Sequence, residues 1–172
     1  MSKPKMSSGR SSAVDAAFAE MRAAKKSYKD LLKVQGKKAV GTMFESFFQA
    51  HPDVIGVTWD QYTPYFNDGD ACTFSVNEPA VVFKAEAGGE EDEDDDDWEG
   101  YGARPDDLKE YFGHKCAAVS LDSSEKKAWE KDLGLIYERI QEFDDVMLAT
   151  FGDHVSVIAS RKGFEVNEQD HD

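Results

Sequence analysis

The sequence predicts an α+β fold, in which a small antiparallel sheet of hairpins packs against two or three amphipathic helices. Apolar residues recur at helical spacing near both ends of the chain, and they alternate as in strands between 54 and 84 and again between 154 and 166. Single strands do not alternate with single helices, so a parallel sheet is not expected. A chain of 172 residues with 40% hydrophobic residues can bury its core as one domain.

Two amphipathic helices are expected before the first strand. The first covers residues 13–34, with lysines on its polar face, and the second ends at His51-Pro52. We expect Gly36 to separate them, because glycine weakens a helix interior. One or both of the long helices, this first one and the last one of the chain, should cover one face of the sheet. The apolar positions of the first helix are Val14, Ala17, Phe18, Met21, Ala24, Tyr28, Leu31 and Leu32.

The first hairpin is expected to begin at Val54. Apolar residues alternate up to Trp59 and again from Cys72 to Val76, and the sequence Asn67-Asp68-Gly69-Asp70 between them is typical of a tight turn. Pro64 cannot donate to a ladder, which favours an edge strand or a bulge near that point. A further short strand is predicted at 80–84.

The second half of the chain is predicted to hold a short helix at 105–112, a strand at 116–119 and one long helix. The long helix starts at a capping box of Asp122 and Glu125 and ends at Gly152. Its apolar stripe should pack on the sheet, with a coiled-coil seam as the alternative. A strand at 154–160 and a turn at 161–163 lead to a return strand. The stripe consists of Trp129, Leu133, Ile136, Ile140, Phe143 and Met147.

Charge is divided unevenly along the chain. The formal net charge is −15, yet residues 1–38 carry +7, which leaves −22 for the remainder. We expect a flexible basic tail at 1–12, and a single domain at 13–172 with a disordered acidic loop inserted at about 87–104. That loop contains eight consecutive carboxylates, from Glu90 to Asp97. It either solubilises the protein or contacts a basic or nucleic-acid-binding partner. Direct nucleic-acid binding is disfavoured, because the body would repel phosphates.

The hairpin around Asp68 is the densest group of chemically active residues. We predict a binding surface there, while packing of its aromatic rings in the core is the alternative. The predicted surface comprises Trp59, Gln61, Tyr62, Tyr65, Asn67, Asp68 and Asp70.

Catalytic and cofactor signatures are weak. No GxxxxGK[ST] or GxGxxG motif is present, so no nucleotide cofactor is expected. A divalent cation is the alternative, held by Asp68, Asp70 and His171, with Asp60 nearby in the sequence; the EF-hand spacing is not met. Cys116 lies two residues from His114, a spacing that is common by chance. The cysteines favour free, buried thiols in a cytoplasmic protein, and no apolar run reaches membrane-spanning length.

Two segments carry a resemblance. The stretch from Gln61 to Asp70, with Cys72 and Phe74 after it, resembles a segment of uncharacterised tailed-bacteriophage proteins. The residues Phe151-Gly152-Asp153-His154-Val155, Gly163-Phe164 and Asp170-His171 are similar to the ends of those proteins. The family has no established activity, so the resemblance implies a phage origin and no catalytic residues.

These observations predict a non-enzymatic, phage-type accessory protein in the host cytoplasm. It would bind a host or phage protein through its acidic surface and the hairpin tip. A small divalent-metal-dependent hydrolase or ligand-binding protein that uses the carboxylates of the hairpin tip and the C-terminus is the alternative, and a structural component of the virion is a third hypothesis.

Overall fold

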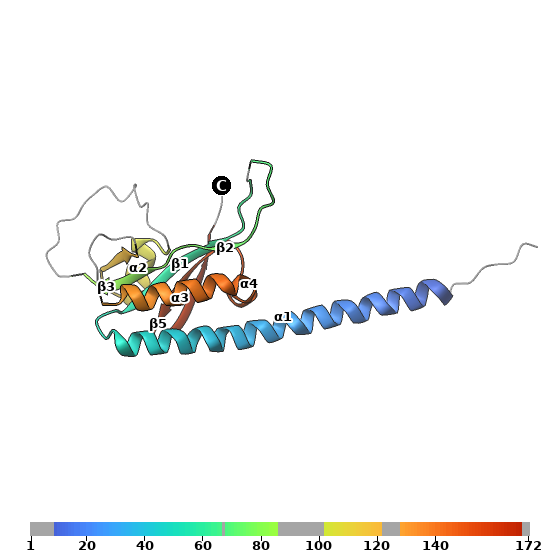
Figure 1. Cartoon of the computed structure of the whole chain (residues 1–172), viewed down its shortest axis with the longest axis horizontal. Helices are drawn as coiled ribbons and strands as arrows, with labels where there is room; N and C mark the ends of the chain where they lie inside the picture. The colour runs from blue at the N-terminus through green and yellow to red at the C-terminus, as the bar shows by residue number, and fades with distance from the viewer. Residues whose placement is uncertain (1–8, 67, 86–101, 122–127, 170–172) are drawn as a thin grey trace, which may run out of the picture.

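The computed structural model describes residues 9–66, 68–85, 102–121 and 128–169, with side chains from residue 13 onward. In these ranges the fold is α+β, as predicted, with four helices and six strands (Figure 1). One antiparallel sheet has the strand order β4-β3-β1-β5-β6, and β2 pairs with the end of β1. The strands are β1 (Gly56–Tyr62), β2 (Ser75–Val76), β3 (Ala80–Lys84), β4 (Cys116–Ser120), β5 (Val155–Ser160) and β6 (Gly163–Glu168).

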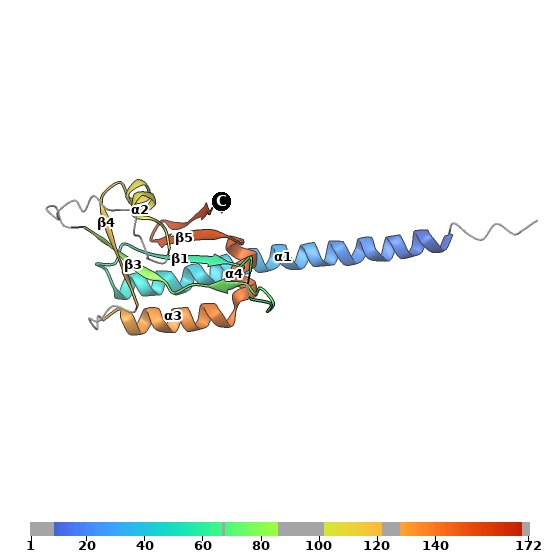
Figure 2. The same ribbon diagram turned by 90° about the horizontal axis from the view of Figure 1, so that it is seen from above.

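Helices cover both faces of this sheet. Helices α1 (Gly9–Ala50), α3 (Glu130–Glu142) and α4 (Asp144–Phe151) pack on one face, where the larger core lies, and α1 and α3 run side by side in both views (Figures 1 and 2). Helix α2 (Pro105–Phe112) covers the opposite face with a smaller cluster. The sequence predicted α2 within its observed bounds but did not predict that it covers this second face. The residues of the smaller cluster are Val82, Ala103, Leu108 and Ile158.

Helix α1 corrects two predictions. It runs unbroken through Gly36, and it starts at Gly9, so residues 9–12 are helical rather than part of a flexible tail. A Cβ atom at Gly36 would lie 2.6 Å from Val146 Cγ1 and closer still to Thr150 Oγ1. The glycine therefore lets α1 cross α4 at close range instead of ending a helix.

Only the C-terminal part of α1 reaches the core. Val40, Phe44 and Phe47 are buried there, whereas every side chain from Ala13 to Leu31 is exposed. Of the two long helices expected to cover the sheet, the last one does so, whereas the first predicted helix lies in a part of α1 that projects away from the body (Figure 1).

The predicted last helix is divided in two. Phe143 adopts a non-helical conformation (φ −122°, ψ 47°) between α3 and α4, so the stripe turns a corner while Leu133, Ile140 and Met147 still pack in the core. Gly152 ends α4 at positive φ, as expected. The predicted capping box, residues 122 and 125, lies outside the described residues.

The structure also corrects the predicted extent of the acidic loop and the predicted burial of the thiols. Residues 86–101 of the acidic segment lie outside the described part, while Gly102 and Ala103 are buried rather than part of a mobile loop. Both cysteines are free, but Cys72 is exposed and Cys116 half-buried, so the expectation of buried thiols is wrong for Cys72. None of the helices in the described ranges combines the length and the hydrophobicity that a membrane span requires.

Candidate binding site at the end of strand β1

The predicted hairpin is shorter than its sequence pattern suggested. Pairing between β1 and β2 involves only Gln61 with Val76 and Tyr62 with Ser75. The described residues between them, 63–66 and 68–74, belong to no strand, and we call this segment the 63–74 loop. Asp68 and Gly69 have positive φ values of 40° and 98°, which places a turn where it was predicted. Asn67, part of the predicted surface, lies outside the described residues.

Trp59 and Gln61 do not belong to a binding surface. They are 1% and 0% exposed, because residues two apart on a strand share a face and this face of β1 meets the helices. The Trp59 ring stacks on Phe44 at 5.5 Å. Gln61 accepts a hydrogen bond from Trp59 Nε1 at 3.2 Å and donates to the Gly152 carbonyl at 2.6 Å. The two side chains tie the central strand to the end of α4.

The exposed aromatic residues lie just beyond them. Tyr65 and Phe66 are 75% and 79% exposed, among the most exposed large apolar side chains in the described residues. The ring of Tyr65 stacks on His154, with centroids 4.7 Å apart and planes inclined by 11°, and Tyr62 lies 6.3 Å from the same imidazole. Tyr62 and Tyr65, which were predicted as site residues, therefore come together around a histidine that the prediction omitted.

Asp153 anchors the start of the 63–74 loop. Its carboxylate accepts hydrogen bonds from Thr63 N and from Thr63 Oγ1, both at 2.8 Å, and it also accepts one from His154 N. Partial burial opposes ionisation, but the two bonds from Thr63 and the nearby imidazole of His154 outweigh it and lower the pKa of Asp153. The ionised carboxylate thus joins the loop to the start of β5. In the sequence, Phe151 to Val155 was identified only as part of the resemblance to phage proteins.

The predicted metal ligands are not brought together in the described residues. Asp60 is satisfied by Gly102 N, Gln169 Nε2 and Ser156 Oγ, so its oxygens already have protein donors. Asp68 and Asp70 are exposed, and no group of three or more metal-ligating side chains forms among the described residues. His171 lies outside them, so a site that includes it stays a prediction.

The Cys116 and His114 pair is close but poorly suited to nucleophilic catalysis. Cys116 Sγ lies 3.5 Å from His114 Nδ1, and it also approaches the His114 carbonyl at 3.3 Å. Burial raises the pKa of the Cys116 thiol, which disfavours the reactive thiolate. Cys116 therefore has the features of a packed thiol rather than of an activated nucleophile.

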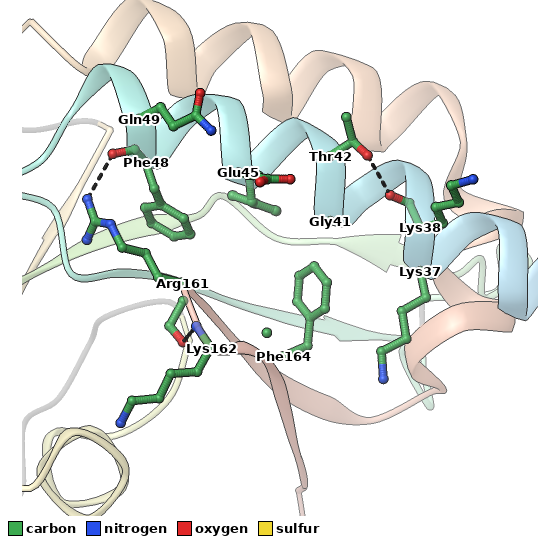
Figure 3. A pocket seen from close by; sticks show the side chains of 13 residues that line it. Lys37, Lys38, Gly41, Thr42, Glu45, Phe48, Gln49, Arg161, Lys162 and Phe164 are labelled. Carbon is green, nitrogen blue, oxygen red and sulfur yellow. Dashed lines mark hydrogen bonds between the residues drawn. The ribbon is translucent and has the colours of Figure 1, made fainter.

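A second surface, which sequence reasoning missed, lies at the other end of β5. A groove of about 630 Å³ separates α1 from the β5–β6 turn (Figure 3). Lys37 and Lys162 flank the ring of Phe164 there. The guanidinium of Arg161 is already hydrogen-bonded within the protein. It donates to the Phe48 and Val54 carbonyls at 2.8 Å and caps the end of α1. The basic residues were visible in the sequence, but their convergence depends on the packing of α1 against β6.

Comparisons of the chain with family models, with curated proteins and with solved structures find no match.

Proposed function

We propose that this chain is a non-enzymatic, phage-type accessory protein that binds a basic segment of a protein partner at the 63–74 loop. The observation that carries the proposal is the exposure of two adjacent aromatic rings, Tyr65 and Phe66, on a loop held by Asp153. Exposed aromatic side chains on an anchored backbone supply large contact area at a low cost in conformational entropy.

The charge around these rings favours a cationic partner. No Lys or Arg occurs between residues 60 and 77 or between 151 and 160, whereas Asp68, Asp70 and Asp153 lie in these segments. Lysine and arginine side chains pair with carboxylates and also stack on aromatic faces. A basic peptide segment would satisfy both features, while a nucleic acid would be repelled. We place this activity in the cytoplasm, in keeping with two cysteines that form no disulfide.

The proposal is tested by affinity capture from a bacterial lysate with the full chain as bait. We expect Tyr65→Ser/Phe66→Ser to lose a protein that the unsubstituted chain retains at low salt, and we expect high salt to release it. Leu135→Ser is the matched control, because Leu135 is an exposed apolar residue on α3, 50% exposed, away from the loop. Thermal melting checks that each variant is folded.

The proposal fails if no protein is retained above background at low salt. It also fails if the double variant captures the same proteins as the control in equal amount.

A further inference from the structure

The exposed part of α1 carries an apolar stripe that nothing in the described residues covers. Every side chain from Ala13 to Leu31 is exposed, and this segment projects beyond the body (Figures 1 and 2). Most helical stability in proteins comes from packing an apolar face, so an uncovered stripe of this length indicates a partner. The large apolar residues of the segment, with their exposures, are Val14 53%, Phe18 53%, Met21 65%, Tyr28 56% and Leu31 58%; Val34, just after it, is 65% exposed.

The stripe has the seven-residue period of a coiled coil. With Val14 at position a, the a positions continue as Met21 and Tyr28, and the d positions are Ala17, Ala24 and Leu31. All six are apolar over three heptads. In the same register the later a and d positions are polar, and they lie in the part of α1 that packs on the body. These later positions are Gln35, Lys38, Thr42, Glu45 and Gln49.

The body leaves this seam accessible. The buried residues of α1 that contact the sheet and α4 include Gly36, Val40, Phe44 and Phe47, at positions b, f, c and f of the same register, and Phe48, at g. Positions b, c and f lie on the outer side of a coiled coil, away from a and d, and Phe48 lies beyond the end of the apolar seam at Leu31. A helix paired along the a and d seam would therefore leave the body on the outside.

We propose that the occupant is a second copy of this chain, paired in parallel and in register through residues 13–34 of α1. In a parallel pair, each g position meets the following e position of the other helix. Glu20 at g then faces Lys25 at e of the other copy, which gives two opposite-charge contacts by symmetry. Ala13 likewise faces Phe18, and Ser27 faces Leu32.

The antiparallel arrangement loses this complementarity. There e meets e and g meets g, so Glu20 never meets Lys25 and the charges give no cross-helix attraction. The parallel pair also leaves the basic residues Lys26, Lys29 and Lys33 at b and f, on the outside, where their like charges stay solvated.

Sedimentation equilibrium of the full chain tests the pairing. We expect a reversible dimer that Met21→Asp converts to monomer, because it places a charge in the middle of the seam. Glu20→Lys or Lys25→Glu alone should raise the dimer Kd about tenfold by turning two attractive contacts into repulsive ones. The double swap Glu20→Lys/Lys25→Glu should restore the Kd. Lys26→Glu, at an outer position, is the matched control and should leave the Kd within about twofold.

Disulfide trapping tests the orientation. In a Cys72→Ser/Cys116→Ala background, Val14→Cys and Tyr28→Cys should each form a dimer with themselves, because equivalent a positions meet in a parallel pair. An antiparallel pair can trap at most one of the two positions. The inference is overturned by a chain that stays monomeric at tens of micromolar, by a dimer that Met21→Asp leaves intact, or by trapping at one position alone.

Discussion

Gln61 offers a sharp test of how the central strand is held. Its amide accepts a hydrogen bond from Trp59 Nε1 and donates to the carbonyls of Gly152 and Met147, the latter at 3.3 Å. Leucine keeps much of the side-chain volume but makes none of these bonds. The indole N–H and the Gly152 carbonyl would then be buried beside an apolar group.

The expected cost follows from these two groups. A buried polar group left without a partner costs about 1–3 kcal/mol, so two of them cost about 2–6 kcal/mol. The more favourable burial of leucine offsets about 1–2 kcal/mol of this. We therefore expect Gln61→Leu to lower the free energy of unfolding by about 1–4 kcal/mol, against the roughly 5–15 kcal/mol typical of a domain. For a chain of this size, at about 2–4 °C per kcal/mol, the melting temperature would fall by about 2–16 °C.

Urea denaturation followed by circular dichroism measures the effect. Gln141→Leu is the matched control, because Gln141 is exposed on α3 and the two residue types have similar helix propensity; it should change stability by less than about 0.5 kcal/mol. If Gln61→Leu unfolds with the same free energy as the unsubstituted chain, the hydrogen bonds of Gln61 are not what holds β1 to α4.

Two further predictions concern α1 and Asp153. Gly36→Ala should lower the free energy of unfolding by about 1–3 kcal/mol, because the added methyl group would collide with α4. Thr150→Ala in the same chain should restore part of this free energy, as measured by urea denaturation. Equal stability of Gly36→Ala and the unsubstituted chain would contradict the close crossing. Because the pKa of Asp153 is lowered in the fold, its ionised carboxylate stabilises the protein at pH values above 3.8, the ordinary pKa of this group. The contribution disappears as the pH falls through the lower pKa of the folded state. Asp153→Asn should therefore melt below the unsubstituted chain at neutral pH, with the gap closing in the acid range below about pH 4; a gap that is constant from pH 7 to pH 3 would refute this role.

Local patterns predicted the type of an element well where the signals for it lie within the segment itself. Helix α2 and strand β3 have their predicted bounds, because a proline start, a glycine end and a run of β-branched residues are signals contained within each segment. Gly36 and Phe143 show the limit of such signals. Glycine in a helix is either a break or a close crossing, and only the presence of α4 beside Gly36 decides between them.

The candidate site was predicted in part. Tyr62 and Tyr65 do come together, whereas Trp59 and Gln61 belong to the core. Alternation along β1 indicated that Trp59 and Gln61 share a face, but not whether that face meets helices or solvent. Asp153 and His154 come from a segment some 90 residues further along the chain, and β5 must pair with β1 before they reach Thr63 and Tyr65.

The amino-acid order alone determined the α+β class, the sequence of most elements, the division of charge and the heptad spacing of residues 14–31, because each of these depends on neighbours within about one turn or one strand. The tertiary structure decided which apolar faces are buried. The face of β1 with Trp59 meets α1 and α4, while the equally apolar stripe of α1 is left in solvent. Burial depends on which distant segments meet, and periodicity within one segment carries no information about that.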